Sequence, residues 1–574
     1  MKNKELADLF EKMADILEFK GENPFKINAY RKASRIIGDL TEDIEAIAGQ
    51  GELKEIPGIG ESMAQKIGEY IETGKISKFE EIREGVPDDL IAIMDIPGMG
   101  PKTLSMLHKE KGIGNLSQLE KALEDGSLMG LFGIGEKKIE NIKRGILLLK
   151  QSHGRINLGI AFPVAKQIVE TLRQKTGSRK IEWAGSLRRM RENIGDIDIL
   201  AAGSDKAKIV QTFTHLPEVK EVLASGETKV SVIVKGFTQI DLRVVEEDSY
   251  GAALQYFTGS KGHNVHLRGI AKAKGIKINE YGVFKGEKKI GGKEEADVYR
   301  VIGMEWVDPE LREDRGEIEA AQEGRLPKLI QESDILGDLH VHSKWSDGTS
   351  SIEEIAKAAQ RRGYQYVAIC DHTKSLKIAH GLDESRLMKQ IEEIDRLNER
   401  LKGFQFLKGS EVDILADGKL DFSEKVLEKL DIVVGAIHSG FKQDKVRMTK
   451  RIVRALENPH LNILAHPSGR LLGARDPYEI DTDEVMETAR KYGKALEINA
   501  WFERLDLNDI HCRKAKEMGI RIGIGTDSHR LDQMWMMSLG IAVARRGWLE
   551  KKDVLNTLSL KEILKWCRSN RQTG

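Results

Sequence analysis

Hydrophobic and polar positions change their spacing along the chain. The first residues, MKNKELADLFEKMADILEF (1–19), place apolar side chains three and four apart, which predicts an amphipathic helix. From about residue 155 the pattern instead favours short strands, over 180–186, 195–203, 229–236 and 238–245. The segment 305–329 has no clear periodicity and is predicted to be a linker.

The remaining third of the chain predicts a different architecture. Seven apolar runs alternate with helical stretches, and they read LGDLHVHS, YVAICDHT, FLKGSEVDI, VVGAIHSG, NILAHPSG, ALEINA and GIGTDSH. Regular alternation of strand and helix is typical of parallel α/β folds, so we expect a barrel here.

Three related phrases recur in the first 150 residues: LKEIPGIGESMAQKI (53–67), IMDIPGMGPKTLSML (93–107) and LMGLFGIGEKKIENI (128–142). Each joins two helices through a glycine turn, and the N–H groups that open the second helix suit a phosphate. A single copy would fit an ordinary helical corner, but three copies resemble helix-hairpin-helix motifs, which grip the DNA backbone. The DNA-contacting glycines would be Gly58, Gly60, Gly98, Gly100, Gly133 and Gly135.

Composition bounds the class of protein. The 574 residues suffice for several domains, with 40% hydrophobic and 32% charged residues. The three cysteines are far apart in the sequence, which favours a reducing compartment, and no apolar run is long enough for a membrane span. We therefore expect a cytoplasmic protein without membrane contacts.

Net charge alone does not identify a nucleic-acid-binding protein. The chain has a net charge of zero, but residues 1–150 carry 22 basic against 27 acidic side chains, and residues 151–300 carry 25 against 18. The helical first region is acidic, so any DNA binding there would depend on backbone amides rather than on long-range attraction.

Two aspartates stand two positions apart in the predicted strand of NIGDIDIL (193–200). Asp196 and Asp198 would project to the same side, and Asp241 lies in another predicted strand. Pairs of this kind are often solvated strand edges, but three such carboxylates can also hold two divalent cations. Ten residues earlier, AGSLRR supplies Gly185, Ser186 and Arg189, a Gly-Ser turn with a guanidinium suited to a triphosphate.

Over residues 1–315 the motifs GSLRR…GDIDIL, IDLR, YFTGSKGHN and KINEYG resemble, in order, the palm and thumb of family X DNA polymerases. The resemblance implies Mg²⁺ ligation by Asp196, Asp198 and Asp241, with Asp241 also helping to activate the primer 3′-OH. It implies dNTP contacts by Gly185, Ser186, Arg189, Gly195, Tyr256, Phe257, Gly259 and Asn264. Arg268 would reach the template, and Asn279, Glu280 and Tyr281 also fit the family pattern.

Two positions depart from the family pattern. The family aromatic residue before the asparagine is His263, and the following basic residue is Val265. Stacking on the nucleotide and contact with the template are therefore expected to be weaker or different.

The N-terminal region resembles the family module that binds a 5′-phosphate. The resemblance rests on NPFKINAYRKASRII (23–37) and the first hairpin, with Lys26 as a DNA contact. Lys66 occupies the position at which some relatives form a Schiff base with an abasic sugar. Such a lysine must be unprotonated, which requires desolvation or a cationic neighbour. A lysine that contacts phosphate or solvent is the equally open alternative.

Histidines and carboxylates concentrate at the ends of the seven predicted C-terminal strands. They are His340, His342, Asp347, His372, Glu411, His438, His466, Asp527 and His529. These strand ends form the edge where α/β barrels carry their chemistry, and the ligand set suits two or three ions of the Zn²⁺ or Mn²⁺ type. The motifs resemble the PHP phosphoesterase domain, which implies metal-assisted hydrolysis of phosphate esters. Arg470 and Asn499 are weaker candidates for phosphate contacts.

Together these patterns predict a multidomain α/β protein with a helix-hairpin-helix N-terminal region, a nucleotidyltransferase-type palm and thumb, and a C-terminal PHP (β/α)7 barrel. The expected segments are a 5′-phosphate/lyase-like domain (1–85), a fingers-like helical domain (86–154), palm (155–255), thumb (256–315), linker (316–332) and PHP domain (333–574).

We expect a monomeric polymerase that fills short gaps in DNA bearing a 5′-phosphate, using dNTPs. The barrel would add a 3′–5′ exonuclease, 3′-end-processing or abasic-site endonuclease activity. The alternatives are a nuclease or a small-molecule phosphatase whose polymerase region only binds DNA. A non-catalytic DNA scaffold would lack ligands, and none is missing.

Overall fold

The computed structural model describes residues 2–38, 40, 44–86, 90, 93–94, 100–124, 127–128, 156–234, 239–472 and 475–569. The chain divides into two compact units, Met1–Arg155 and Ile156–Gly574. Among the described residues, no helix combines the length and apolar character that crossing a membrane requires.

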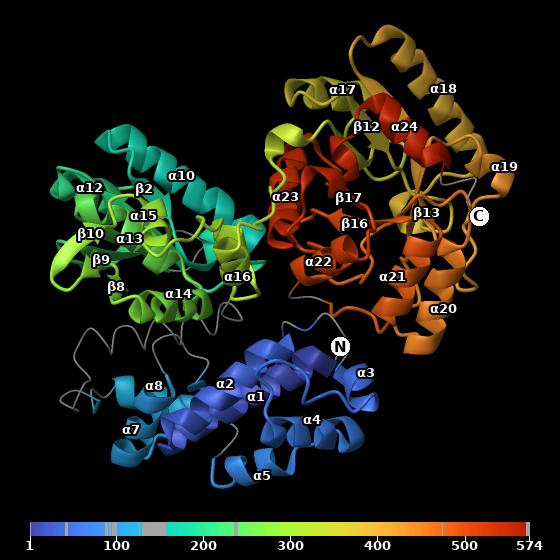
Figure 1. Ribbon diagram of the computed structural model, residues 1–574. Helices are drawn as coiled ribbons and strands as arrows, with labels where there is room; N and C mark the ends of the chain where they lie inside the picture. The colour runs from blue at the N-terminus through green and yellow to red at the C-terminus, as the bar shows by residue number, and fades with distance from the viewer. Residues whose placement is uncertain are drawn as a thin grey trace. The chain divides into compact units, whose positions relative to one another are not determined.

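The first unit is helical (Figure 1). Its helices are α1 (Lys2–Lys20), α2 (Pro24–Gly38), α3 (Ile44–Gly49), α4 (Glu61–Thr73), α5 (Ser77–Arg83), α7 (Pro101–Lys111) and α8 (Leu116–Glu124). The amphipathic pattern at the N-terminus forms the long helix α1, whose Leu6, Phe10, Met13 and Leu17 are buried in the core of the unit. The second glycine hairpin is described only in part, and the third lies outside the described residues.

The second unit begins with a five-stranded sheet in the predicted palm. The strand order is β2-β4-β7-β6-β5, and β4 and β7 run parallel. The strands are β2 (Ile181–Trp183), β4 (Ile197–Ala202), β5 (Val219–Ser225), β6 (Lys229–Val234) and β7 (Gln239–Val245). A separate pair joins β1 (Ile156–Asn157) to β3 (Asn193–Ile194), and the palm helices are α10 (Leu158–Thr176), α11 (Gly185–Arg188) and α12 (Lys206–Thr214).

Two predicted palm strands are too long, and the short pair β1 and β3 and one strand of the five-stranded sheet were not predicted. The strand predicted over 180–186 ends at Trp183, because α11 begins at Gly185, where φ is +61°. The strand predicted over 195–203 begins at Ile197, so Asp196 precedes it. Strand β5 (Val219–Ser225) was missed because, apart from partly covered Val219, Leu223 and Ala224, it is exposed at the sheet edge and lacks a continuous apolar pattern.

The end of the predicted palm and the predicted thumb pack helices against a three-stranded antiparallel sheet, and one helix crosses the boundary predicted at 255/256. The elements of this region are α13 (Tyr250–Thr258), α14 (Lys261–Ala273), β8 (Ile276–Asn279), β9 (Gly282–Lys285), β10 (Lys288–Gly291) and α15 (Glu295–Arg300), preceded by η1 (Glu247–Ser249). Val283, Tyr299 and Ile302 are buried in its core.

The segment predicted as a linker is packed. It contains η2 (Pro309–Leu311), α16 (Glu317–Gln322) and η3 (Glu332–Asp334), and Ile318 and Leu329 belong to the thumb core. Arg312 is fully buried and donates to the Glu295 carboxylate (2.7 Å) and to the Val307 carbonyl. The segment lacks a clean period because polar groups such as Arg312 are buried and paired inside it. We call residues 305–332 the connector.

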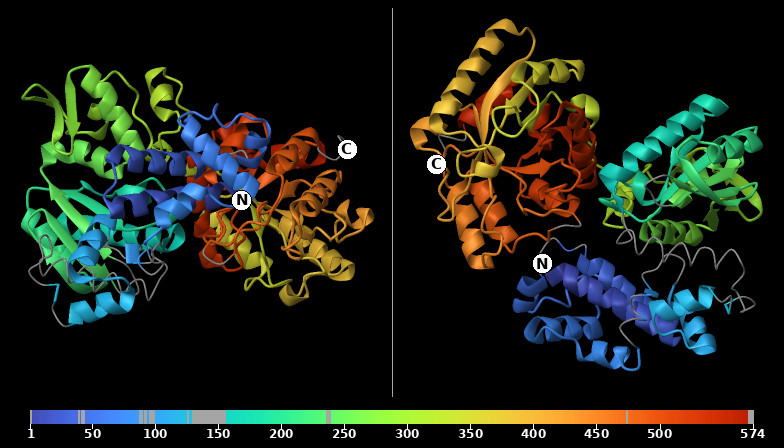
Figure 2. Two further views of the ribbon diagram at one scale, coloured as in Figure 1. Left: turned by 90° about the horizontal axis from the view of Figure 1, so that it is seen from below. Right: turned by 180° about the vertical axis from the view of Figure 1, so that it is seen from behind.

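The C-terminal region forms the predicted seven-stranded parallel barrel, with strands in sequential order (Figures 1 and 2). They are β11 (Gly337–Val341), β12 (Tyr366–Ile369), β13 (Gln405–Asp413), β14 (Ile432–Ala436), β15 (Ile463–Leu464), β16 (Ala495–Asn499) and β17 (Ile522–Gly525). The chain closes the barrel after β17, because Asp527 N–H donates to the His340 carbonyl and His342 N–H to the Ser528 carbonyl.

Helices surround the strands of the barrel (Figures 1 and 2). They are α17 (Ile352–Arg361), α18 (Glu384–Arg400), α19 (Glu424–Leu427), α20 (Lys445–Leu456), α21 (Thr482–Lys491), α22 (Asp509–Glu517), α23 (Met537–Arg546) and α24 (Leu560–Ser569), with the short turns η4 (Lys377–Ala379), η5 (Leu531–Met536), η6 (Lys551–Asp553) and η7 (Leu555–Thr557). Helix α17 begins with a capping box in which Ser351 and Glu354 exchange hydrogen bonds with the backbone. The alternation of strand and helix thus predicted the parallel α/β class of this region, and the structure adds the sequential strand order.

A buried ionic cluster joins the palm, the connector and the barrel. The Glu313 carboxylate accepts from Arg189 (3.1 Å) and Arg191 (3.2 Å) of the palm and from Arg546 (3.0 Å) of the barrel. Arg546 also donates to Asp509 (2.7 Å). Burial raises the pKa of Glu313, but the arginines outweigh burial and hold that pKa far below its usual range.

We expect Glu313→Ala to lower the free energy of unfolding of the second unit by about 3–5 kcal/mol, because it leaves buried guanidinium groups without their anion. The measurement is urea unfolding followed by tryptophan fluorescence at pH 7. The stabilisation should fade as the pH falls through 4, where Glu313 becomes protonated in the unfolded chain but resists protonation when folded. Glu319→Ala, on the exposed side of α16, is the matched control, and an equal effect of both variants would contradict the assignment.

Candidate active sites

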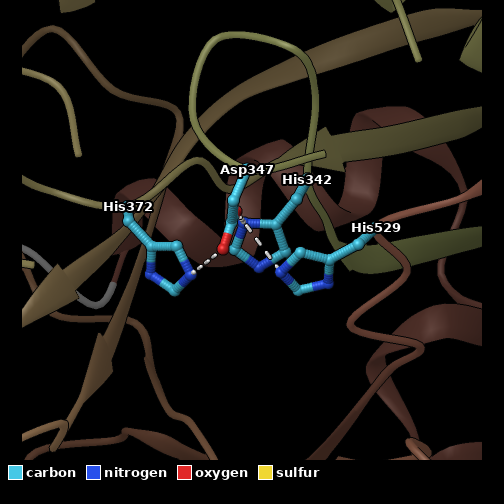
Figure 3. Close-up of side chains that lie close together, drawn as sticks. All are labelled: His342, Asp347, His372 and His529. Carbon is cyan, nitrogen blue, oxygen red and sulfur yellow. Dashed lines mark ion pairs between the residues drawn. The ribbon is translucent and has the colours of Figure 1, made fainter. Parts of the chain in front are cut away.

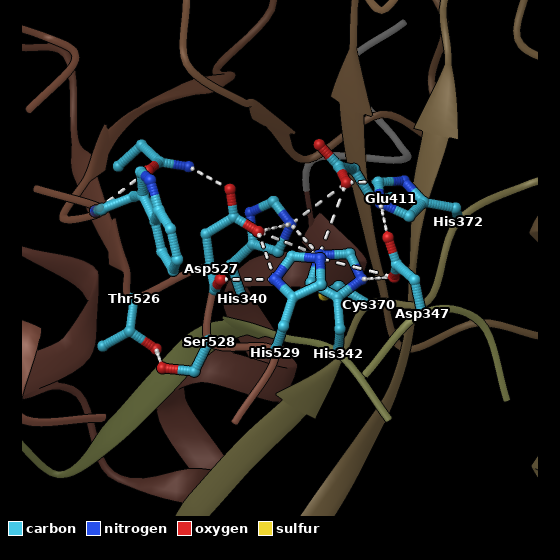
Figure 4. Close-up of polar contacts among 12 residues, drawn as sticks. His340, His342, Asp347, Cys370, His372, Glu411, Thr526, Asp527, Ser528 and His529 are labelled. Atoms are coloured by element: carbon cyan, nitrogen blue, oxygen red, sulfur yellow. Dashed lines mark hydrogen bonds and ion pairs between the residues drawn. The ribbon is translucent and has the colours of Figure 1, made fainter. Parts of the chain in front are cut away.

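The structure brings the nine predicted barrel ligands together at the carboxyl ends of the strands. Figures 3 and 4 label His340, His342, Asp347, His372, Glu411, Asp527 and His529 among them. His340 lies in β11 and Glu411 in β13, and the other residues follow their strands directly or lie in the turn after β11. Side chains that alternate along parallel strands reach one edge of the barrel, so residues far apart in sequence converge there.

Three overlapping groups have the composition and spacing of metal sites. Within each, one ligand atom per residue lies within 4.8 Å of the others. The groups are His342, Asp347, His372 and His529; His340, His342 and Asp527; and His372, Glu411 and His438. His466 stands beside the third group, with Nε2 2.9 Å from Oε1 of Glu411. Eight of the nine predicted ligands are therefore in such groups, and the ninth contacts one.

Several ligand atoms lack the hydrogen bonds that burial normally requires. Nδ1 of His342, Nδ1 of His372, Nδ1 of His466 and Oε2 of Glu411 are buried, and none makes a hydrogen bond within the described part of the chain. Nδ1 of His372 approaches Oε2 of Glu411 to 2.9 Å without hydrogen-bond alignment. Because buried polar atoms are nearly always satisfied, these atoms fit the role of cation ligands.

Electrostatic coupling within the cluster is strong. Burial raises the pKa of Glu411, but His438 and its neighbours outweigh burial and hold that pKa well below its usual range. Burial lowers the pKa of His438, but the Glu411 charge outweighs it and raises the pKa to about 10. Burial and the neighbouring His529 and His372 lower the pKa of His342 to about 3. The carboxylates thus stay ionised and draw positive charge into the cluster.

Two carboxylates behind the ligands were missed in the sequence. Oε1 of Glu497 lies 2.7 Å from Nδ1 of His340, and Oδ1 of Asp413 lies 2.7 Å from Nδ1 of His438. Such partners fix the orientation of ligand histidines. The signal was available, because Asp413 stands two positions after Glu411 on the same strand, and Glu497 is a carboxylate near a strand end.

The two weaker phosphate candidates have other contacts. Asn499 donates from Nδ2 to Asp527 (3.1 Å) and to Glu497 (3.2 Å). Arg470 donates to the Glu192 carboxylate (2.6 Å) and to the Arg504 carbonyl (2.9 Å). Asn499 therefore contacts the carboxylates of the site, and Arg470 contacts the loop backbone and the palm.

In the palm, Asp198 and Asp241 face each other across parallel strands. They are register partners on β4 and β7, and Asp196 stands just before β4. A Cβ on Gly185 would lie 2.9 Å from Oδ2 of Asp198, and the φ of +61° at this position also favours glycine. Among the described residues, every set of three or more histidine, cysteine or carboxylate side chains whose ligand atoms lie within 4.8 Å of one another is in the barrel. The three palm aspartates are therefore farther apart than the barrel ligands.

The three palm aspartates differ in their electrostatics. Lys229 (2.7 Å) and Gln239 (2.6 Å) donate to the Asp241 carboxylate, and with Ser231 they outweigh burial and lower the pKa of Asp241. Burial, with the charges of Asp196 and Asp241, raises the pKa of Asp198 to about 7. Burial and Asp241 also raise the pKa of Asp196. The site concentrates negative charge that the described residues only partly neutralise.

Comparison with known proteins shows which family the chain belongs to. Four family models match: "Helix-hairpin-helix domain" (1–76), "SAM-like Helix-hairpin-helix tandem" (88–146), "DNA polymerase beta thumb" (253–313) and "PHP domain" (338–501). The chain is 41% identical over 575 residues to "DNA polymerase/3'-5' exonuclease PolX" of Bacillus subtilis (strain 168), covering 99% of this chain and 100% of that protein. The chain belongs to the family X DNA polymerases that carry a PHP domain.

A second kind of relative matches a shorter part of this family X polymerase. A "Probable phosphatase" of Thermoanaerobacter sp. (strain X514) is 32% identical over 241 residues, which cover 40% of this chain and 94% of that protein. A "Probable phosphatase" of Caldanaerobacter subterraneus is 30% identical over 41% of this chain and 92% of its own length.

The predicted nucleotide contacts of this family X polymerase are partly engaged within the protein. Arg189 donates to the Thr258 carbonyl (2.5 Å) and to Glu313, so its guanidinium joins the palm to the thumb and connector. Asn264 is buried, accepts from Gln255 and donates to the Tyr256 carbonyl. Their roles toward dNTPs stay predictions, as does that of Gly195 and Ser186.

The aromatic part of the predicted pocket is assembled. The rings of Tyr256 and Phe257 meet edge to face at 5.2 Å, and the Arg268 guanidinium lies 6.0 Å from the Tyr256 ring. Gly259 has φ +72°, and a Cβ there would lie 3.1 Å from Nη1 of Arg189.

His263, the departure from the family pattern, lies inside the thumb. It is fully buried between Glu317 (2.7 Å) and the Tyr299 hydroxyl (2.9 Å). The burial of His263 agrees with the expectation that stacking on the nucleotide is weaker or different here. Val265 is exposed, and its effect on template contact stays a prediction.

In the first unit, the structure describes the first glycine hairpin and the two predicted lysines, Lys26 on α2 and Lys66 on α4. Gly58 has φ +91°, and Gly60 is the N-cap of α4, as Gly100 is of α7. Lys66 donates to Ser62, and desolvation and the charge of Lys78 lower its pKa. Lys26 pairs with Glu22 at 3.3 Å. Gly98, Gly133 and Gly135 lie outside the described residues.

We expect Asp198→Asn to stabilise the metal-free protein, by about 1–3 kcal/mol at pH 8 and by less at pH 5. The folded state holds the Asp198 proton up to about pH 7, so wild-type stability falls as the pH rises from 4 to 7. The measurement is urea unfolding in EDTA at both pH values. The exposed Asp248→Asn is the control, and equal stabilisation at both pH values would contradict the electrostatic account.

Proposed function

We propose that this protein is a DNA-directed DNA polymerase that fills short gaps during repair and also trims 3′ ends as a 3′–5′ exonuclease. The observation that carries the proposal is the presence of two separate acidic sites in one chain, which is related over its full length to a protein named for both activities. One site would prepare a 3′-OH and the other would extend it. We expect it to act as a cytoplasmic monomer.

In the palm, Asp196, Asp198 and Asp241 would hold Mg²⁺. Divalent cations bound there and in the barrel would neutralise charge that develops on the reacting phosphate groups. Asp241, whose pKa is lowered, is the carboxylate best suited to remain ionised beside the primer 3′-OH. Lys229, which lies 2.7 Å from Oδ2 of Asp241, would have to release that oxygen for the carboxylate to hold a cation, and its side chain is half-exposed.

In the barrel, the nine histidines and carboxylates would hold two or three ions of the Zn²⁺ or Mn²⁺ type. The three overlapping groups share His342 and His372, which fits closely spaced ions. Glu411 contacts ligands of more than one group and is fully buried, so it can stabilise positive charge without access to bulk water. Asp413 and Glu497 keep His438 and His340 in their orientations.

A small-molecule phosphatase is the second candidate, favoured by the relatives named as probable phosphatases. Those relatives match 40–41% of this chain, which also carries helix-hairpin-helix and thumb regions. A nuclease whose palm only delivers DNA would not need the aspartate pair on β4 and β7. Primer extension discriminates between these readings.

The first unit would bind the 5′-phosphate at a gap. Gly58 and Gly60 shape the turn before α4, and the opening N–H groups of that helix suit a phosphate. Lys26 and Lys66 would add charge-assisted contacts. The lowered pKa of Lys66 also supports Schiff-base chemistry with an abasic sugar.

We expect Asp241→Asn to abolish primer extension and spare hydrolysis, and His342→Ala to remove nuclease activity and barrel metal while sparing extension. Each change deletes a ligand of one site only. The measurement uses a labelled one-nucleotide-gapped duplex with and without dNTPs, in Mg²⁺ and in Mn²⁺, with elemental analysis of bound metal. Extension at the wild-type rate by Asp241→Asn would refute the palm assignment, and unchanged metal in His342→Ala would refute the ligand assignment.

We also expect removal of the downstream 5′-phosphate to weaken gap binding by about 1–3 kcal/mol, because charge-assisted hydrogen bonds are lost. Lys26→Ala combined with Lys66→Ala should erase most of that difference. The measurement is fluorescence anisotropy with matched gapped duplexes. Lys12→Ala, on α1 of the same unit, is the control, and equal wild-type affinity for both duplexes would exclude a 5′-phosphate pocket.

A further inference from the structure

The loop that follows β16 reaches the ligand cluster of the barrel. It leaves the strand at Asn499 and returns at Asp506, where Asn499 N–H donates to the Asp506 carbonyl (2.5 Å) and Asp506 N–H to the Asn499 carbonyl (3.2 Å). Within the loop, Arg504 N–H donates to the Trp501 carbonyl (2.7 Å). The loop is therefore short, and hydrogen bonds between Asn499 and Asp506 join its two ends. The hydrogen bond to Trp501 fixes the backbone at Arg504.

The Arg504 side chain lies beside a predicted ligand with part of its hydrogen-bonding capacity unused. Its Nε lies 3.8 Å from Oδ2 of Asp527, and the side chain is 16% exposed. Nη1 of Arg504 is buried and makes no hydrogen bond within the described part of the chain. Oδ2 of Asp527 already accepts from Asn499 (3.1 Å). A buried guanidinium N–H without an acceptor indicates a missing partner.

Charge determines what that partner must be. Arginine stays protonated, and cations in the adjacent clusters would add positive charge beside it. A second anion near Arg504 would relieve this repulsion and supply the missing acceptor. Guanidinium groups bind phosphate through paired N–H···O bonds, which matches a donor left open next to a phosphoesterase site.

We propose that Arg504 binds the phosphate group of the DNA substrate at the barrel site. The inference rests on the proposed nuclease function and adds a substrate-binding residue to it. The ligand is a phosphate mono- or diester at a DNA 3′ end, held between the guanidinium and the metal ligands.

Palm residues support this loop from the other side. Arg470 holds the Arg504 carbonyl (2.9 Å) and is itself held by Glu192 of the palm (2.6 Å). Phe502 packs on Gly159 at the start of α10 so closely that a Cβ on Gly159 would lie 2.1 Å from the Phe502 Cβ. Glu192 is thus a positioning residue that acts on the barrel site through Arg470 and the Arg504 loop.

The first test measures hydrolysis and extension by the full-length protein carrying Arg504→Gln, Arg504→Lys or the exposed control Arg447→Gln. Arg504→Gln should lower kcat/KM for 3′-end hydrolysis by about 100-fold or more. Arg504→Lys should recover only part of that loss, because it keeps the charge but not the paired donors. Bound metal and primer extension should be unchanged. Wild-type hydrolysis by Arg504→Gln would overturn the proposal while leaving the nuclease function intact.

The second test does not depend on catalysis. Inorganic phosphate is titrated by calorimetry into the Mn²⁺-loaded full-length protein. The affinity should fall about tenfold or more in Arg504→Gln and stay unchanged in Arg447→Gln. If wild-type protein hydrolyses no DNA, the proposed function fails, yet this titration still decides the role of Arg504. Equal phosphate affinity in wild type and Arg504→Gln would overturn it.

The positioning role of Glu192 is tested in the same titration. Glu192→Gln should weaken phosphate binding on its own but add no further loss to Arg504→Gln, because both changes would remove one interaction. Additive losses would show that Glu192 does not act through Arg504.

Discussion

Buried carboxylates that must meet positive charge are the constraint on which this structure depends. A carboxylate moved out of water is costly unless a cation or several hydrogen-bond donors accompany it. The chain meets this requirement in three ways. Arginines surround Glu313 at the junction, Lys229 covers Asp241 in the palm, and histidines surround Glu411 in the barrel. Of these three carboxylates, Glu313 is the one whose partners are permanently charged side chains.

This difference separates structural from chemical acidic groups. The arginines around Glu313 cannot lose their protons, so the cluster has one stable charge state and holds palm, connector and barrel together. Lysine and histidine can leave or deprotonate, so Asp241 and Glu411 can exchange those partners for metal ions. A buried carboxylate therefore stabilises the fold at Glu313, whereas the carboxylates of Asp241 and Glu411 remain able to bind metal.

The sequence predicted the parts of the structure that short-range periodicity and strand-end chemistry determine. The seven barrel strands and their ligands follow from alternating patterns, and His340 and His342 were found because they share one strand face. The connector was predicted to be an unpacked linker because it lacks hydrophobic periodicity. Its charged residues Arg312 and Glu317 are buried, and a hydrophobic pattern cannot reveal the burial of charged side chains. The partners of Arg189 and His263 also could not be predicted, since Glu313 and Glu317 are more than 50 positions away in the sequence.

The packed connector has a consequence for how two activities share one DNA end. Residues 305–332 are built into the thumb core and tied to the barrel through Arg545, which pairs with Asp308 (2.9 Å) and Glu310 (2.8 Å). A packed connector of this kind lacks the freedom of a flexible linker that could carry one site to the other. Under the proposed function, the primer terminus itself would therefore move between the sites, by dissociating or by fraying from its template. Proofreading would then depend on the rate of extension relative to the rate of strand release. Mispaired ends fray more readily, so they would reach the nuclease site more often even though no residue recognises the mismatch.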